Sequence, residues 1–228
     1  MWPPLVNASV RRKINLSITK TEINRIVGQP DAWSLGNRVL YDLCAACPGH
    51  TDDSEIVAKV WLIGRAYAAS IERARSGGIS SEASNDDFYV SVVAPALRRS
   101  KLDSHIESVR RLNSADPARV VAALEAHGYL VQLFKRLTNK GKRSLASKYL
   151  HFHLPEAFFI YDSRAVTAMR RLAPEPVPVR VPRSADREYA KFVASACGLQ
   201  RACEKLGIQA TPRQIDRILL ARFADRSV

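Results

Sequence analysis

The sequence is poor in cysteine and contains no long apolar run. Its 228 residues include only four cysteines, and no stretch approaches membrane-spanning length. A membrane helix needs roughly 20 consecutive apolar residues. The first residues, Met-Trp-Pro-Pro, also lack the basic start and apolar core of a signal peptide. We therefore expect a cytoplasmic protein that does not enter a membrane and whose cysteines are free thiols.

The cysteine spacing raises the question of a metal site. Cys44-Ala-Ala-Cys47 is half of a common zinc-binding pattern. The gap between Cys197 and Cys203 is too wide for the usual second half. Cys44 and Cys47 also fall on the apolar face of a predicted helix, where cysteine serves as a small hydrophobic residue. We expect neither a metal nor a cofactor.

Acidic residues are scarce relative to basic ones. The chain has 35 Lys and Arg against 22 Asp and Glu, a formal charge of +13. Residues 1–114 hold 15 basic and 12 acidic residues, whereas residues 115–228 hold 20 and 10. No acidic residue lies between Glu125 and Glu156. A positive charge this uneven predicts a polyanionic partner, most often nucleic acid.

The alternation that marks β-strands is absent, and helical periodicity dominates. We predict an all-α fold, either one domain over residues 1–228 or two lobes that share a cleft. An irregular arm is expected at 1–17 and a proline-rich surface linker at 173–183. Helices are predicted at about 19–27, 33–47, 53–75, 86–99, 103–113, 117–137 with a break near Gly128, 144–153, 163–172, 184–206 and from 211 onward.

The stretch 137–164, LTNKGKRSLASKYLHFHLPEAFFIYDSR, combines a basic turn, a helix-like run and an apolar segment that ends in an acid. Asn139 and Gly141 supply the backbone freedom of a tight turn. A helix that follows such a turn presents unpaired N–H groups and the positive end of its dipole, which together favour phosphate. Pro155 ends the helical pattern, and an apolar segment then leads to Asp162.

This stretch resembles the helix-hairpin-helix DNA glycosylases, and more narrowly their 8-oxoguanine glycosylase branch. Members of that branch carry a hairpin of the form Leu-Pro-Gly-x-Gly-x-Lys, then a helix, then an apolar segment that ends in a catalytic Asp. Leu137 matches the leading Leu, Gly141 the second hairpin Gly and Asp162 the catalytic Asp. The position of the catalytic Lys falls on Arg143, which is 19 residues before Asp162 as in the family.

The hairpin departs from the family pattern at three positions. Thr138 stands in place of Pro, Asn139 in place of the first Gly and Arg143 in place of Lys. An arginine stays protonated and cannot act as a nucleophile. The neighbouring Lys142 is the replacement candidate, because nearby cations disfavour its protonated form. Members without a catalytic Lys work with the Asp alone, so the departure bears on strand cleavage more than on base removal.

The resemblance implies two helical lobes around a basic cleft and an enzyme of base-excision repair. Such an enzyme removes a damaged, oxidised purine from duplex DNA by cleaving its N-glycosidic bond, with or without a lyase step. Asp162 would stabilise the positive charge that builds on the sugar. Asp162-Ser163 is also a good N-cap, so the carboxylate can cap a helix, catalyse, or do both.

Further residues are assigned by their place in this stretch or near it. The expected DNA contacts are Lys140, Gly141, Arg143, Lys148 and Arg164. An extruded base needs flat side chains around it, and the candidates are Trp61, Tyr67, Tyr149, Phe152 and Tyr161.

Two histidines and the choice of partner complete the predictions. His151 and His153 diverge on a helix, so we reject a shared metal site. A glycosylase-like fold does not guarantee activity, and the alternative function is an inactive module that binds nucleic acid. RNA stays open as a partner beside DNA, and we expect a monomer.

Overall fold

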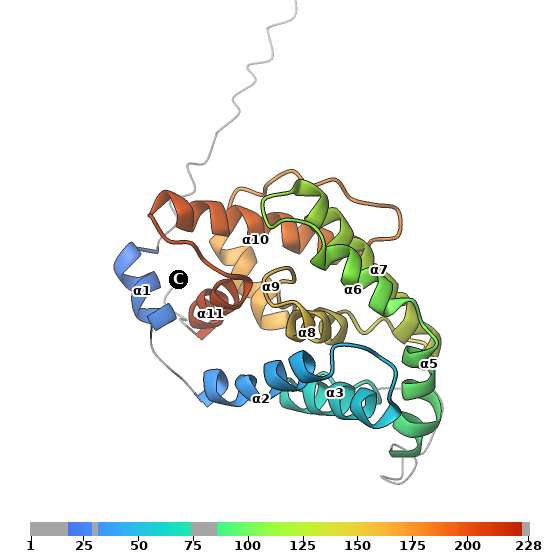
Figure 1. Ribbon diagram of the computed structural model, residues 1–228. Coiled ribbons are helices and arrows are strands. Elements are labelled where there is room, and N and C mark those ends of the chain that lie inside the picture. Colours follow the sequence, from blue (N-terminus) through green and yellow to red (C-terminus); the bar gives the residue numbers. More distant parts are fainter. Residues whose placement is uncertain (1–17, 29–31, 74–85, 225–228) are drawn as a thin grey trace, which may run out of the picture.

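The computed structural model describes residues 18–28, 32–73 and 86–224 (Figure 1). Within these ranges the chain is helical and contains no strand, which confirms the all-α prediction. The predicted arm at 1–17 lies outside the described residues. The elements are α1 (Lys20–Gly28), α2 (Ala32–Ala46), α3 (Asp53–Ala66), a π-helical turn η1 (Tyr89–Val93), α5 (Ala94–Arg98), α6 (Leu102–Arg110), α7 (Pro117–Thr138), α8 (Arg143–His153), α9 (Ser163–Leu172), α10 (Arg187–Lys205) and α11 (Pro212–Ala224). None of these helices is both long and apolar enough to cross a bilayer.

The buried apolar side chains form two separate cores. The first joins residues of α2, α3, η1 and α5 to α8, and the second joins residues of α1, α9, α10 and α11. Helix α7 contributes to both, through Leu130 to the first and through Leu124 to the second. In Figure 1, α8 lies in the middle, with α2 and α3 on one side and α9 and α11 on the other. A side chain on α8 can therefore meet groups from either core.

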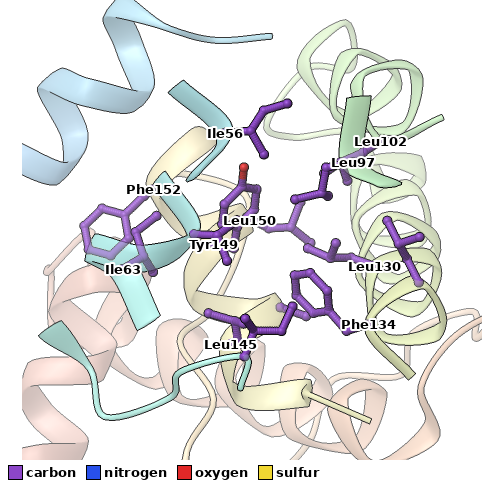
Figure 2. Packing of buried hydrophobic residues seen from close by; sticks show 14 of the residues in the cluster. Ile56, Ile63, Leu97, Leu102, Leu130, Phe134, Leu145, Tyr149, Leu150 and Phe152 are labelled. Carbon is purple, nitrogen blue, oxygen red and sulfur yellow. The ribbon is translucent and has the colours of Figure 1, made fainter. Parts of the chain in front are cut away.

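Helix α8 is buried along nearly its whole length. Its residues Leu145 to His153 are all buried, including one lysine and two histidines. Figure 2 shows Leu145, Tyr149 and Phe152 of α8 packed among apolar side chains of the surrounding helices, such as Ile63 and Phe134. Burying a side chain of this size contributes about 1.5–3 kcal/mol. The helix is thus the central element of the first core.

The helix predicted to run to residue 75 is wrong, because α3 ends at Ala66. Ala68 adopts a left-handed conformation with φ 50°, and the N–H of Ala69 bonds to the carbonyl of Gly64 at 2.8 Å. An added Cβ at Gly64 would lie 3.1 Å from the Cα of Ser70, so the glycine permits this return of the chain. Tyr67 consequently lies at the end of α3 rather than along its side.

The predicted break near Gly128 is also wrong, because α7 is continuous through it. A Cβ at Gly128 would overlap the carbonyl of Ser184 and lie 3.0 Å from the Cα of Ala185. The glycine is needed for close approach of two chain segments, not for a helix break. Gly198 of α10 has the same role beneath Glu175, where it lets the proline-rich segment 173–183 lie against the helix.

Of the two residues predicted to give the basic turn between α7 and α8 its backbone freedom, one adopts a left-handed conformation. Asn139 has φ 58° and caps the end of α7, with its N–H bonded to the carbonyl of Lys135. Gly141 does not take up a left-handed conformation. Thr138 closes the turn, because its hydroxyl donates to the carbonyl of Phe134 at 2.8 Å. The replacement of the hairpin glycine by asparagine is therefore compatible with a tight turn.

Candidate functional site

Asp162 lies where an extended segment meets the start of α9. The backbone of residues 158–161 is held by side chains of other helices: the N–H of Tyr161 donates to the Ser147 hydroxyl at 3.0 Å, and the Tyr189 hydroxyl donates to the carbonyl of Phe159 at 2.9 Å. His151 bonds to the carbonyl of Phe158 at 2.8 Å. Because buried backbone groups need such partners, the segment has one defined path. It delivers Asp162 to a fixed place beside α8.

The two oxygens of Asp162 have different partners. Oδ1 accepts from the N–H of Ala165 at 2.9 Å and so caps α9. Oδ2 accepts from the ammonium of Lys148 on α8 at 3.3 Å. Burial alone would raise the pKa of Asp162, but Lys148, the Ala165 N–H and Arg164 outweigh it and hold the pKa below its ordinary value. Asp162 is thus an ionised carboxylate that serves as cap and ion-pair partner at once.

Lys148 is the cation that the structure places beside Asp162. Its side chain is 2% exposed, and its ammonium also donates to the Ser144 hydroxyl at 2.8 Å. Burial lowers the pKa of Lys148 although Asp162 opposes that shift. The sequence predicted a phosphate contact for Lys148, whereas in the structure its ammonium donates to Asp162 and Ser144. A buried lysine with a lowered pKa is instead a typical nucleophile or proton carrier.

A second ion pair on α11 faces the first. Arg213 donates to the Asp216 carboxylate at 2.6 Å, and Asp216 is 2% exposed. Burial raises the pKa of Asp216 to about 6, against the attraction of Arg213, and the nearby Asp162 adds to the rise. The spacing of Arg213 and Asp216 places both on one face of a helix, but nothing in the sequence indicates which buried group that face meets.

Tyr67 contacts both Lys148 and Arg213 and is hydrogen-bonded to a residue of α2. The ammonium of Lys148 lies 5.4 Å from the centre of the Tyr67 ring, within the range of a cation–π contact. The Tyr67 hydroxyl donates to Oδ1 of Asn37 at 2.9 Å and accepts from Arg213 at 3.5 Å. Burial raises the pKa of Tyr67 to about 12, so the hydroxyl stays protonated. Trp33, which is 47% exposed, packs its ring 5.5 Å from that of Tyr67.

We name the resulting group the polar cluster: it consists of Asn37, Tyr67, Lys148, Asp162, Arg213 and Asp216. Its members come from α2, the end of α3, α8, the start of α9 and α11. The helices α2, α3 and α8 belong to the first hydrophobic core, and α9 and α11 to the second. Charged and hydrogen-bonding side chains from five elements therefore meet where the two cores adjoin. Perturbed titratable groups of this kind are typical of functional sites.

The hairpin cations lie apart from this arrangement. Lys142 donates to the carbonyl of Arg73, and burial lowers its pKa. Arg143 forms an ion pair with Asp186 at 2.6 Å and lies 5.5 Å from the centre of the Tyr161 ring. Lys140, Gly141 and Arg164 are exposed. The structure thus brings Asp162 together with Lys148, and none of the contacts of Lys142 involves Asp162.

The five predicted base-pocket aromatics occupy different environments. Tyr149 and Phe152 are fully buried in the first core, and the Tyr149 hydroxyl bonds to His50 at 2.7 Å. Trp61 is 39% exposed on α3 with the Arg65 guanidinium over its ring. Tyr161 packs against α10 residues next to Asp162, and Tyr67 belongs to the polar cluster. Only Tyr67 and Tyr161 adjoin the carboxylate among these five.

The histidines and cysteines form no metal site in the described residues. No group of three or more His, Cys, Asp or Glu side chains in that part of the chain is arranged to hold a metal. His151 points to Tyr41, at 2.7 Å, whereas His153 lies beside His50. Cys44 and Cys203 are buried and all four cysteines are free thiols.

Comparison with protein-family models, with curated proteins and with solved structures finds no match to this chain.

Proposed function

We propose that this protein is a DNA N-glycosylase and that Asp162 and Lys148 carry its chemistry. The observation behind the proposal is the 3.3 Å contact between a carboxylate and a lysine that is almost completely removed from water. Lys148 lies one helical turn after Ser144, on the same face of α8. It takes the role for which the sequence suggested Lys142.

Cleavage of an N-glycosidic bond develops positive charge at C1′ of the sugar, and a fixed carboxylate stabilises that charge. Asp162 supplies the carboxylate, and its oxygens need no rearrangement because Ala165 and Lys148 already orient them. Lys148 reacts as the free amine, after its ammonium has released a proton to water, so Asp162 stays ionised. The amine attacks C1′, the bond to the base breaks, and the electron pair of that bond leaves with the base. The base takes up the proton that the newly bonded nitrogen releases.

The lysine also accounts for a lyase step. Nζ, which is bonded to C1′ and has lost a proton, then uses its lone pair to form a double bond to C1′ as the bond between C1′ and the ring oxygen breaks. The ring oxygen takes up a proton from water, and an iminium results. A lowered pKa increases the fraction of Lys148 that is present as the free amine. Without attack by Lys148, water oriented by Asp162 would give base removal alone.

The charge of the chain supports DNA as the partner. The formal charge is +13, and the exposed Lys140 and Arg164 lie at the two ends of the segment that carries α8 and Asp162. The first turn of α8 has no side-chain cap, so its N–H groups can bind a phosphate. An oxidised purine in duplex DNA is the proposed substrate, on the resemblance of residues 137–164 to 8-oxoguanine glycosylases.

Borohydride trapping tests the proposal, because borohydride reduces only an enzyme–DNA iminium to a stable bond. Duplexes that carry single oxidised purines are incubated with the parent protein and with Lys148→Gln, Lys142→Ala and Asp162→Asn. We expect base release and trapping with the parent, no trapping with Lys148→Gln, retained trapping with Lys142→Ala, and strongly reduced base release with Asp162→Asn.

One alternative has its own supporting observation. Asp162 already caps α9 and neutralises Lys148, so both oxygens have structural partners. In a catalytically inactive nucleic-acid-binding module, these contacts would be the whole role of the residue. Binding of duplex DNA without release of any base, or base release unchanged in Asp162→Asn, would favour that alternative.

A further inference from the structure

Asn37 holds a buried hydrogen-bond donor without a partner. The residue is 3% exposed, and its Nδ2 makes no hydrogen bond to any part of the described chain. A buried donor left unpaired costs about 1–3 kcal/mol, and such groups in folded proteins call for an explanation. The residue belongs to the polar cluster, where a ligand would supply the missing acceptor.

The orientation of the amide follows from its neighbours. Arg213 donates to the Tyr67 oxygen, which directs the hydroxyl hydrogen of Tyr67 to Oδ1 of Asn37 at 2.9 Å. The oxygen of the amide is thereby occupied, and the two hydrogens on Nδ2 are the free groups. Tyr67 also lies against the Lys148 ammonium, so the free donor adjoins the proposed reaction site.

An aromatic surface lies at the same place. Trp33 is on α2, four residues before Asn37, and its half-exposed ring packs on Tyr67. Flat side chains of this kind hold an extruded base by stacking, while a polar group reads its edge. Trp33, Tyr67 and Asn37 together offer both functions.

We infer that Asn37 determines substrate specificity by donating from its amide to an exocyclic carbonyl oxygen of the extruded base. This inference rests on the proposed function and narrows its substrate to keto purines such as guanine-type and 8-oxo bases. A purine with an amino group in that position would place the N–H donor of the base against the N–H donor of Asn37. The Asn37 amide would then stay unpaired, and the amino group of the base would be unpaired as well. A site built to hydrogen-bond one group of a substrate discriminates strongly against a substrate that lacks this group.

The test measures binding, so it does not depend on turnover. Duplexes are prepared with a 2′-fluoro sugar at one purine, which resists base release, and carry either hypoxanthine, a keto base, or adenine, an amino base. Fluorescence anisotropy gives the affinity of each duplex. One hydrogen bond corresponds to a factor of about ten in affinity, and we expect the parent protein to prefer the keto duplex by at least that factor.

Two variants locate the preference at Asn37. In Asn37→Asp the donor becomes an acceptor with nearly the same shape, and we expect the preference to vanish or reverse. In Asn37→Ser a smaller hydroxyl replaces the amide, and we expect a preference between those of the parent and of Asn37→Asp. Equal binding of both duplexes by the parent would overturn the inference even if neither variant folded.

The outcomes separate this inference from the proposed function. Base release is measured in parallel on duplexes with ordinary sugars. Absence of all base release with a retained keto preference that depends on Asn37 would reject catalysis and keep the recognition site. Base release with no keto preference, or with a preference unchanged in Asn37→Asp, would keep the enzyme and reject the role of Asn37.

Discussion

The ammonium of Lys148 lies 3.3 Å from the Asp162 carboxylate, and the two residues come from elements of different hydrophobic cores. Taking two such charges out of water costs several kcal/mol for each ion, and their attraction offsets this only with good additional hydrogen bonds. Ser144 and Ala165 provide one each. A buried ion pair is weak evidence for stability, so its presence at the junction of the cores favours a role in chemistry.

Lys148 should titrate below the exposed lysines. Burial lowers its pKa from the ordinary 10.5, whereas Asp162 acts in the opposite direction. Removing the carboxylate in Asp162→Asn should therefore lower the pKa of Lys148 further. The ¹³Cε signals of labelled lysine, followed by NMR as pH is raised, measure this directly. A Lys148 signal that titrates at or above the ordinary pKa of 10.5 would contradict the assignment.

Asp216 should make the protein less stable as pH rises from about 4 to about 6. Its pKa is raised to about 6 by burial in the folded state and is near 3.9 when unfolded. The folded state therefore binds the extra proton, so the stability gained by protonation is present at low pH and is lost as pH rises through that window.

The variant Asp216→Asn isolates this effect, because an amide does not titrate. Chemical denaturation at several pH values gives the free energy of unfolding of the parent and the variant. The difference between them should change in favour of the variant between pH 4 and pH 6 and stay constant above about pH 7. A difference that is constant over the whole range would show that the carboxylate is not buried in this way.

Gly128 should be intolerant of a side chain although it lies within a helix. Its hydrogen faces the backbone of Ser184 and Ala185, and neither backbone can move without shifting the start of α10. We expect Gly128→Ala to destabilise the fold by about 1–3 kcal/mol, as overpacking does. The matched control is Gly36→Ala in α2, which meets nothing within 4 Å and should stabilise by up to about 1 kcal/mol. Thermal unfolding of both variants shows whether each substitution destabilises or stabilises the fold.

Helical periodicity and capping residues are enough to predict the fold class and most helices. Asp116 with Pro117 and Asp162 with Ser163 begin α7 and α9 as their sequences indicate. The predictions fail where long-range contacts decide local structure. Gly128 resembles a helix break because the neighbouring Ser184 lies far away in sequence, and the end of α3 depends on the unexpected left-handed Ala68.

The candidate site is predictable in part. Asp162 stands out because it follows an apolar run at a characteristic distance from a basic turn. Its partner Lys148 does not, because it stands among other cations, and sequence alone does not separate a buried lysine from an exposed one. Asn37 lies more than a hundred residues before Lys148, and Arg213 and Asp216 lie on a helix without any motif of its own. Only the packing of α2 and α11 near α8 brings these three residues to Lys148.

The hairpin should bind DNA through its backbone phosphates and without sequence preference. Three cations stand in or beside the turn: Lys140 is exposed, whereas Lys142 and Arg143 are partly engaged with the carbonyl of Arg73 and with Asp186. Replacing all three by Ala should weaken binding and reduce the slope of log affinity against log salt by about 0.9 for each phosphate that is no longer neutralised. The engaged pair should contribute less, so Lys140→Ala alone should account for much of the change in slope.

The control removes the same charge at exposed cations of α10, namely Lys191, Arg201 and Lys205. Anisotropy titrations with an undamaged duplex at several salt concentrations give the slopes. Equal slopes for the parent and the hairpin variant, with a reduced slope in the α10 control, would place the DNA contact on α10 instead.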